Sequence, residues 1–273
     1  YTERDTQPVL YLLCTHPLRL TQAHPLQLDE KDEMVFTEDP DDLVDITTRI
    51  LETNNATSEM LMEGDIMVPR TRTAIRCLWS NECLWKRKKS ENLVKVPYTL
   101  SSDFDHYSQG KIKYAMNTFH TKTCVRFVQR SNQRDYLSIE SRSGCYSWVG
   151  KTGGKQLISL EKRGCVYHGT IQHELLHALG FYHEQNRSDR DKYIRINWEY
   201  VERGEEPNFD KEDTNNLDIP YDYSSVMHYN RWSFSTVYRK ETITPIPDAT
   251  VSIGQSLEMS AIDVQRVNKL YRC

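Results

Sequence analysis

The sequence predicts an α+β fold, and two patterns lead to this class. β-branched and aromatic residues alternate over residues 94–100 and 124–130, which is typical of strands. Between these strands, Lys111–His120 has apolar residues at helical spacing and is expected to form an amphipathic helix. The helix would turn three side chains inward: Ile112, Met116 and Phe119.

The other predicted elements also show either alternation typical of strands or apolar residues at helical spacing. An apolar stripe within Asp42–Glu52 predicts a helix near the N-terminus. Further strands are expected at Tyr136–Glu140 and Gln156–Leu160, and further helices at Gly169–Leu179 and Ser260–Tyr271. The last helix begins with a capping box, because Ser260 is followed three residues later by Asp263.

Composition excludes several classes of protein. Of the 273 residues, 38% are hydrophobic, and no apolar run approaches the roughly 18 residues that a membrane span needs. Residues 1–72 contain 15 acidic and 6 basic side chains, whereas residues 73–273 have a small basic excess. That excess is diffuse, so we expect no nucleic-acid binding. The acidic segment is either a solvated tail or docked on the basic part of the chain.

A catalytic metal site is predicted by the run from His173 to His183. His173 and His177 are four residues apart, so a helix places both imidazoles on one face, where they can bind one Zn²⁺. Glu174 can act as the base towards a water at the metal. Gly180 lets the chain leave the helix, and His183 returns as a third ligand. Three protein ligands leave one position open, which is typical of a catalytic zinc site.

Two further motifs resemble those of a known family. Ser225-Val226-Met227-His228-Tyr229 resembles the Met-turn beneath the zinc of metzincins. This motif and the stretch His183–Asp191 are similar to the astacin family, over roughly residues 60–273. Within that family the chain resembles the fish hatching-enzyme type and its six-cysteine relatives.

The resemblance implies the metzincin catalytic fold. An N-terminal subdomain would contain a twisted, mostly parallel or mixed sheet and the zinc helix. A C-terminal subdomain would have few elements and a final helix, with the zinc in the cleft between the two. Met227 would then support the site, and Tyr229 would ligate zinc and swing away to contact the transition state. Glu184 is expected either to contact the mature N-terminus, as in the simplest astacins, or to be a buried structural acid.

The resemblance also implies that the chain is a proenzyme. Met62–Ile66 resembles the propeptide motif Phe-x-Gly-Asp, with Met62 in place of Phe. Asp65 would bind the zinc and displace the catalytic water, and Gly64 would allow the close backbone approach. An activating protease would cleave after Arg70 or Arg72. This divides the chain into an N-terminal segment and propeptide, 1–72, and a catalytic domain, 73–273.

Seven cysteines indicate an oxidising compartment. Cys14 stands apart, and the other six allow 15 pairings that the sequence does not distinguish. The resemblance implies three disulfides: Cys124–Cys273, Cys145–Cys165 and Cys77–Cys83. We therefore expect a secreted, extracellular protein, with secretory granules as one route of release. Two glycosylation sequons, at Asn55 and Asn186, fit the same compartment.

The predicted function is that of a secreted zinc endopeptidase, made as a latent and monomeric proenzyme with one Zn²⁺ per chain. Its substrates would be extracellular proteins, with egg-envelope proteins suggested by the hatching-enzyme resemblance. Arg239 and Lys240 lie in a region that is a candidate for selecting an acidic residue after the cleaved bond. The alternative is a non-catalytic extracellular or egg-envelope binding protein on the same fold. Loss of a ligand or of Glu174 would favour that alternative, and neither is lost.

Overall fold

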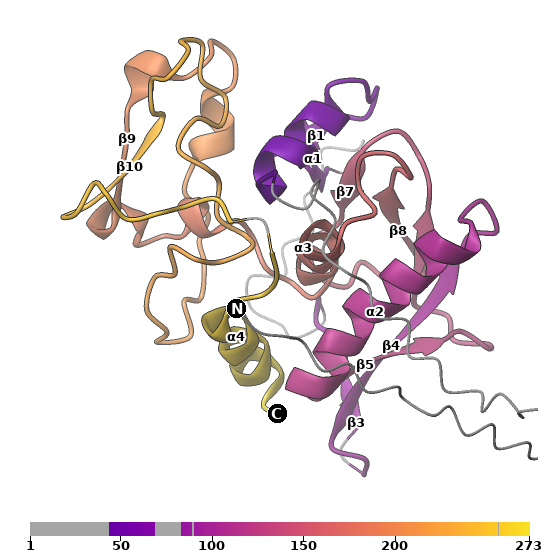
Figure 1. Ribbon diagram of the computed structural model, residues 1–273. Helices are drawn as coiled ribbons and strands as arrows, with labels where there is room; N and C mark the ends of the chain where they lie inside the picture. Colours follow the sequence, from indigo (N-terminus) through magenta and orange to yellow (C-terminus); the bar gives the residue numbers. More distant parts are fainter. Residues whose placement is uncertain (1–43, 69–82, 89, 256) are drawn as a thin grey trace, which may run out of the picture. The chain divides into compact units, whose positions relative to one another are not determined.

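A computed structural model describes residues 44–68, 83–88, 90–255 and 257–273. These residues belong to one compact unit, Phe36–Cys273. Within it, the large sheet lies with α2 and α3, whereas β9 and β10 lie in a separate part of the unit, beyond α3 (Figure 1). No helix among the described residues is long and apolar enough to cross a membrane.

The large sheet is mixed, as expected. Its strands are β1 (Leu61–Met62), β2 (Ile66–Met67), β3 (Arg87–Lys88), β4 (Leu93–Leu100), β5 (Val125–Gln129), β6 (Tyr136–Glu140), β7 (Cys145–Ser147) and β8 (Lys155–Leu160). Their order is β1-β2-β7-β8-β6-β4-β3, and β5 pairs with β4. The pairs β4–β5, β4–β6, β6–β8 and β2–β7 are parallel, and the others are antiparallel.

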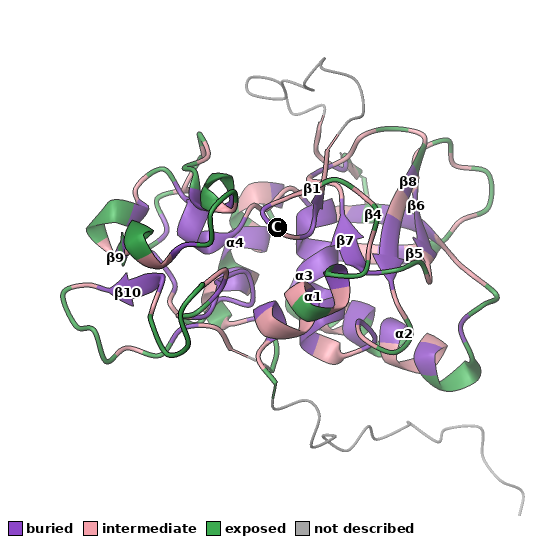
Figure 2. Cartoon of the chain, turned by 90° about the horizontal axis from the view of Figure 1, so that it is seen from above, coloured by how far each residue is buried: buried purple, intermediate pink, exposed green. Residues whose placement is uncertain are grey.

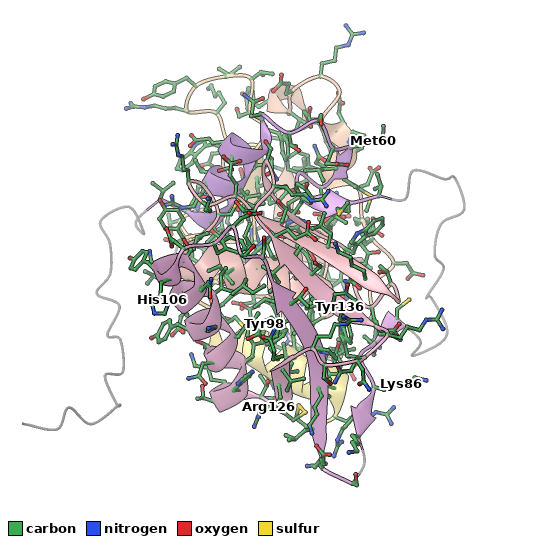
Figure 3. All side chains as sticks on the ribbon, turned by 90° about the vertical axis from the view of Figure 1, so that its right-hand side faces the viewer. Met60, Lys86, Tyr98, His106, Arg126 and Tyr136 are labelled. Atoms are coloured by element: carbon green, nitrogen blue, oxygen red, sulfur yellow. A yellow bond between two sulfur atoms is a disulfide. The ribbon has the colours of Figure 1, made fainter. Side chains whose placement is uncertain are left out.

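Helix α2 (His106–Lys122) packs its apolar face against this sheet. Ile112, Ala115, Met116 and Phe119 recur at helical spacing, and all four are buried. The predicted helix began five residues too late, because the first turn is polar and depends on a cap. The side chain of Asp105 accepts a hydrogen bond from the backbone of Ser108 at the N-terminus. Figure 3 shows His106 at the start of this helix and Tyr98 on β4.

Helix α1 (Ile46–Asn54) belongs to the predicted N-terminal segment, yet it packs into the main hydrophobic core. Ile46 and Ile50 are buried there, against residues of the sheet and of α3. The side chain of Asn54 donates to the carbonyl of Cys145 at 2.7 Å and accepts from its backbone N–H at 2.6 Å. Residues 44–68 are therefore docked on the rest of the unit. The predicted boundary at residue 72 falls outside the described residues and stays a prediction.

The C-terminal part has few regular elements, as the resemblance implied. It contains the antiparallel pair β9 (Ile194–Ile196) and β10 (Ile243–Pro245) and several single turns of 3₁₀-helix. A smaller apolar core of its own includes Phe209, Tyr221 and Tyr229. The sequence did not predict β9, β10 or β7, because each has only three residues, too few to show a periodic pattern.

Helix α4 (Ala261–Tyr271) closes the chain and has the predicted capping box. The Ser260 hydroxyl accepts from the backbone of Asp263, and the Asp263 carboxylate accepts from the backbone of Ser260. Val267 and Tyr271 of this helix are buried in the main core. The C-terminal helix is thus packed on the sheet-containing part of the unit rather than on the smaller core.

Two disulfides join distant parts of the described chain. Cys124, next to β5, is bonded to Cys273, and Cys145 on β7 is bonded to Cys165 ahead of α3. Both match the pairings that the resemblance implied. Cys83 is also disulfide-bonded, but Cys77 lies outside the described residues, as do Cys14, Arg70 and Arg72.

Candidate active site

Helix α3 (His168–Ala178) holds three of the predicted site residues at the centre of the unit. It is buried along its whole length from Gly169 to Ala178, as Figure 2 also shows. The helix can be buried because Glu174 is its only acidic residue and it contains no lysine or arginine. Gly180 then adopts a φ of +105° and ends the helix, and the chain turns so that His183 comes back towards it.

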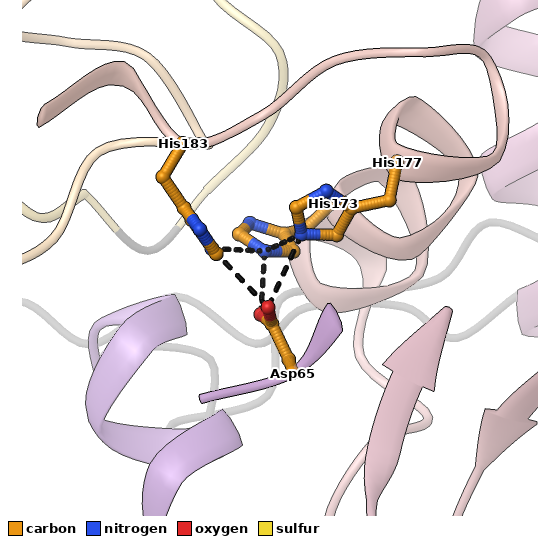
Figure 4. A group of neighbouring side chains, drawn as sticks. All are labelled: Asp65, His173, His177 and His183. Atoms are coloured by element: carbon orange, nitrogen blue, oxygen red, sulfur yellow. Dashed lines mark hydrogen bonds and ion pairs between the residues drawn. The ribbon is translucent and has the colours of Figure 1, made fainter. Parts of the chain in front are cut away.

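The three histidines converge through the same ring nitrogen. His173 Nε2 lies 3.1 Å from His177 Nε2 and 3.3 Å from His183 Nε2. All three rings are almost completely buried. The carboxylate of Asp65 joins them, with Oδ2 2.9 Å from His173 Nε2 and Oδ1 3.3 Å from both His177 Nε2 and His183 Nε2 (Figure 4). Among the described residues, these four form the group whose side chains could hold a metal ion.

The outer nitrogens of the rings show which atoms face the centre. His173 Nδ1 donates to the carbonyl of Val226 at 2.7 Å, and His177 Nδ1 donates to that of Phe181 at 2.7 Å. A carbonyl only accepts, so both Nδ1 atoms carry the proton and both Nε2 atoms present a lone pair. Lone pairs and a carboxylate that converge on one point repel one another unless a cation lies between them. The donor set therefore fits Zn²⁺.

Asp65 reaches the histidines from a tight turn between β1 and β2. Gly64 at its centre has a φ of +78°, and a Cβ at this position would lie 2.5 Å from the Leu51 side chain. The carbonyl of Asp65 accepts from the backbone of Ser147, and Ile66 pairs with Ser147 on strand β7. The turn is thus anchored on the sheet, and this anchoring directs the Asp65 side chain into the histidine cluster.

The charges of Asp65 and of the three histidines depend on one another. Burial opposes ionisation of Asp65, but the neighbouring His183, His177 and His173 hold its pKa well below the usual range. His183 lies between the carboxylates of Asp65 and Glu63. Burial lowers the pKa of His183, and the two carboxylates outweigh burial and raise it to about 9. Burial lowers the pKa of the neighbouring His177 to about 4, despite the carboxylate of Asp65. A proton is therefore favoured on His183, which has a carboxylate on each side, and disfavoured on His177.

Glu174 lies in the same buried site and has no partner of its own. Both carboxylate oxygens lack a hydrogen bond to any described residue. Burial and, after it, the negative charge of Asp65 raise the pKa of Glu174 well above its usual range. A buried carboxylate without a partner is costly for the fold, which favours a role in chemistry over a role in packing.

The Ser225–Tyr229 turn lies beside the histidines, as its resemblance to a Met-turn implied. Met227 is buried in the main core, and Tyr229 in the smaller one, so the turn joins the two cores. The Tyr229 ring is 4.8 Å from that of His183, and its hydroxyl donates to the backbone carbonyl of Glu63. The predicted transition-state contact of Tyr229 remains a prediction, and in this structure the hydroxyl is engaged elsewhere.

Four contacts of the site were not foreseen from the sequence. Glu63 accepts a hydrogen bond from His183 Nδ1 at 2.7 Å, and Val226 and Phe181 supply the carbonyls described above. Asp263 of α4 supports the turn, since its carboxylate accepts from the backbone of Val226. Backbone carbonyls leave no trace in a sequence. Glu63 did leave one signal, because it stands two residues before Asp65 and on the other side of a glycine.

Glu184 follows the third histidine, and its described partners all lie in the predicted catalytic domain. Its carboxylate is within hydrogen-bonding distance of Arg187, of both terminal nitrogens of Arg266 and of the backbone N–H of Asp222. In the uncleaved chain Glu184 is therefore a buried acid with partners of its own. Its contact with the mature N-terminus stays a prediction, because residues 69–82 lie outside the described part of the chain. His228 is also structural, bonded to the Tyr221 hydroxyl and the Tyr229 carbonyl.

Four other predicted residues are outside the group of Asp65 and the three histidines. Arg239 and Lys240 are exposed, and none of their described contacts is with it. Asn186, in the second sequon, is fully buried and donates to the carbonyls of Asn208 and Asp210, which leaves no room for a glycan in the folded chain. Asn55, in the first sequon, is exposed.

Replacement of Gly64 by alanine is expected to loosen the contact between Asp65 and the histidines. A left-handed backbone costs a residue with a Cβ about 1–2 kcal/mol, which corresponds to a population change of roughly 5–30-fold. If the turn blocks the site, peptidase activity of the uncleaved chain should rise by about that factor. The control is Gly204→Ala, at a φ of +100° with no atom within 4 Å of the new Cβ. Equal activity of the two variants would contradict the expectation.

Comparison with known proteins supports the interpretation of the histidine cluster as a zinc site. Residues 84–272 match the family described as Astacin, a peptidase family. High choriolytic enzyme 1 of Oryzias latipes is 51% identical over 267 residues, 97% of this chain and 98% of that protein. High choriolytic enzyme 2 of the same fish is 52% identical over 233 residues, 85% of this chain and 83% of that protein.

A solved structure also matches. That of High choriolytic enzyme 1, described as a hatching enzyme zinc-protease from Oryzias latipes (Medaka fish), aligns with a TM-score of 0.70 at 52% identity. The alignment covers 73% of this chain and 99% of that one. This chain is therefore similar to the solved structure in both sequence and fold, over nearly all of the solved chain.

Proposed function

Because this chain belongs to the astacin family of zinc metalloendopeptidases, we propose that it is a secreted proenzyme, latent as synthesised, whose activated form cleaves egg-envelope proteins. The observation that carries the latency is the position of Asp65. Its carboxylate lies 2.9–3.3 Å from the three Nε2 atoms that would hold the zinc. A fourth protein ligand at the open position of a catalytic zinc site excludes the water that hydrolysis requires.

The same segment also blocks the surface on which a substrate would lie. Ile66 pairs with Ser147 on β7, and β7 has its other neighbour, β8, on the opposite side. An extended peptide can bind a protein by adding a strand to an exposed edge of a sheet. With β2 in place, this edge is occupied. Removal of residues 1–72 would free the zinc position and the strand edge together.

Activation would also change the chemistry of Glu174. Zinc supplies a Lewis acid that lowers the pKa of a water and polarises the scissile carbonyl. Glu174 then accepts the proton from that water and donates it to the leaving amine. Departure of Asp65 removes the like charge that, after burial, keeps the pKa of Glu174 high. It also releases the Tyr229 hydroxyl from the Glu63 carbonyl, so that this hydroxyl can contact the transition state.

Disulfides and relatives support the proposed location and substrate. Cys124–Cys273 and Cys145–Cys165 are stable in an oxidising, extracellular environment. Relatives at 51% and 52% identity are named choriolytic enzymes, and one of them is described as a hatching enzyme. We propose activation by a protease that cleaves after Arg70 or Arg72, and a monomeric enzyme. The alternative, a silent binding protein, is disfavoured because Glu174 and all three histidines are in place.

The proposal is tested with purified chain, before and after cleavage near Arg72. We expect about one zinc per chain in both forms. Only the cleaved form should release soluble fragments from isolated egg envelopes, and a zinc chelator should stop the release. An unrelated extracellular protein of similar size serves as the substrate control. An activated enzyme that hydrolyses peptides but leaves egg envelopes intact would refute the substrate, and an inert zinc-loaded chain would favour the binding protein.

A further inference from the structure

Glu63 is the second acidic side chain that the β1–β2 turn places in the histidine cluster. Its carboxylate Oε2 accepts a hydrogen bond from His183 Nδ1 at 2.7 Å, and the residue is only 1% exposed. Its backbone carbonyl meanwhile accepts the Tyr229 hydroxyl. One residue of the turn therefore engages both a predicted zinc ligand and the predicted transition-state residue.

The backbone at Glu63 indicates that this arrangement is imposed by the contacts. Glu63 has a φ of +50°, a left-handed conformation that is unfavourable for a residue with a Cβ, and Gly64 follows with a φ of +78°. Such a conformation persists where the surrounding structure over-determines it, most often at functional sites. Two successive left-handed residues bring the side chains of Glu63 and Asp65 to the same cluster. Asp65 then faces the Nε2 atoms, and Glu63 faces the opposite nitrogen of His183.

The three histidines differ in what holds their outer nitrogens. His173 and His177 donate to the carbonyls of Val226 and Phe181, which belong to the predicted catalytic domain. His183 donates to Glu63, which lies in the segment that activation would remove. A hydrogen bond to the outer nitrogen fixes the tautomer and the orientation of a metal-bound imidazole, and a carboxylate partner makes that imidazole a stronger ligand.

We propose that Glu63 is a positioning residue of the latent site, which holds His183 as a zinc ligand through a hydrogen bond that activation removes. This inference rests on the proposed latency. The proenzyme would bind zinc with a carboxylate on each side of His183, and the mature enzyme would keep the ligand but lose both carboxylates. The turn therefore does more than fill the open position, because it also stabilises the metal centre during synthesis and storage.

Burial supports this role over a purely structural one. The other oxygen of Glu63, Oε1, has no hydrogen-bond partner among the described residues. A buried carboxylate with one satisfied oxygen destabilises the fold unless a nearby positive charge compensates for it. A divalent ion at the three Nε2 atoms would provide that charge, and the two carboxylates of Glu63 and Asp65 would match it. A glutamine or an apolar residue would pack as well without the charge.

The test compares Glu63→Ala and Glu63→Gln in the uncleaved, zinc-loaded chain, with Arg70 and Arg72 replaced by alanine to prevent activation. In ¹H–¹⁵N NMR of histidine-labelled protein, Glu63→Ala should remove or strongly shift the Nδ1–H resonance of one zinc-binding histidine. The resonances of the two that donate to carbonyls should stay unchanged. Glu63→Gln keeps an acceptor oxygen, so the resonance should persist at a new position. An unchanged spectrum in both variants would overturn the inference.

A second readout is zinc retention against a competing chelator. We expect the uncleaved Glu63→Ala chain to lose zinc about 10–100-fold more readily than the parent, and Glu63→Gln to recover part of the loss. Glu52→Ala, an exposed acid of α1 in the same segment, is the matched control and should behave as the parent. Equal zinc retention in all the chains would also count against the role.

Failure of the inference can be told apart from failure of the proposed function. In chains that retain Arg70 and Arg72, cleavage removes Glu63 from every variant and releases an identical catalytic domain. All activated forms should therefore have equal peptidase activity, whatever residue 63 was. If none of them is active, the proposed enzyme function is wrong, and the NMR comparison on the uncleaved chain still decides the role of Glu63.

Discussion

Replacing Glu174 by alanine in the activated enzyme is expected to lower kcat/KM for a peptide substrate by about 10³-fold, within the range of general acid–base catalysis. Zinc should remain bound, because the three nitrogen atoms that could hold it, from His173, His177 and His183, are unchanged. The physical reason is the isolation of Glu174 in the structure. Its two oxygens have no described partner, so the change removes a proton acceptor without breaking a hydrogen bond of the fold.

The measurement pairs peptide hydrolysis with metal analysis and thermal unfolding of the same samples. Glu174→Gln, of nearly the same shape, should lose activity to a similar extent. The control is Glu199→Gln, an exposed acid on a 3₁₀ turn of the C-terminal part, which should leave kcat/KM unchanged. Activity within about tenfold of the parent in Glu174→Ala would contradict the assigned role of base.

Replacing Asp65 by alanine is expected to give the uncleaved chain measurable peptidase activity, roughly 100-fold above that of the parent proenzyme. Asp65 is the group that lies against all three Nε2 atoms, and contacts of a charged group of this kind contribute about 3 kcal/mol. Without the carboxylate, the zinc position can take up water. The rest of the turn still occupies the β7 edge, so activity should stay below that of the cleaved enzyme.

Arg70→Ala and Arg72→Ala are needed in the same chain, so that self-cleavage does not imitate the effect. Glu52→Ala is again the control, because it changes the charge of the segment by the same amount at an exposed position of α1. The comparison uses a short peptide substrate and gel analysis to show that the chain is intact. A fully latent Asp65→Ala chain would rule out the blocking role of Asp65, and activity in the Glu52→Ala chain would show that charge alone maintains latency.

Most of the large elements could be predicted from the sequence, because each has a local pattern long enough to read. Strand β6 was predicted with its observed bounds, and β4, β8 and α3 were each within one residue at either end. The capping box at Ser260 was also recognised from two residues. The sequence did not predict elements that lack a periodic apolar pattern. These include the short strands β9 and β10 and the capped first turn of α2.

The sequence by itself determined the donors of the metal site. His173, Glu174 and His177 lie on one helix, and Gly180 ends it, so their relation depends on helical geometry that a few residues specify. His183 could be predicted as the third ligand because it follows Gly180 by only three residues. The candidate blocking residue, Asp65, could be named only through its resemblance to a family motif, since 108 residues separate it from His173.

Only the tertiary structure decided how these donors are held and which side chains lie against them. Asp65 meets the histidines because β2 pairs with β7, and Glu63 meets His183 because two left-handed residues turn it inward. The carbonyls of Val226 and Phe181, which orient the other two ligands, are chemically the same as every other carbonyl in the chain. Such contacts depend on the packing of distant segments and on backbone groups. Neither can be predicted from the local sequence, because the packing is long-range and every residue has the same backbone carbonyl.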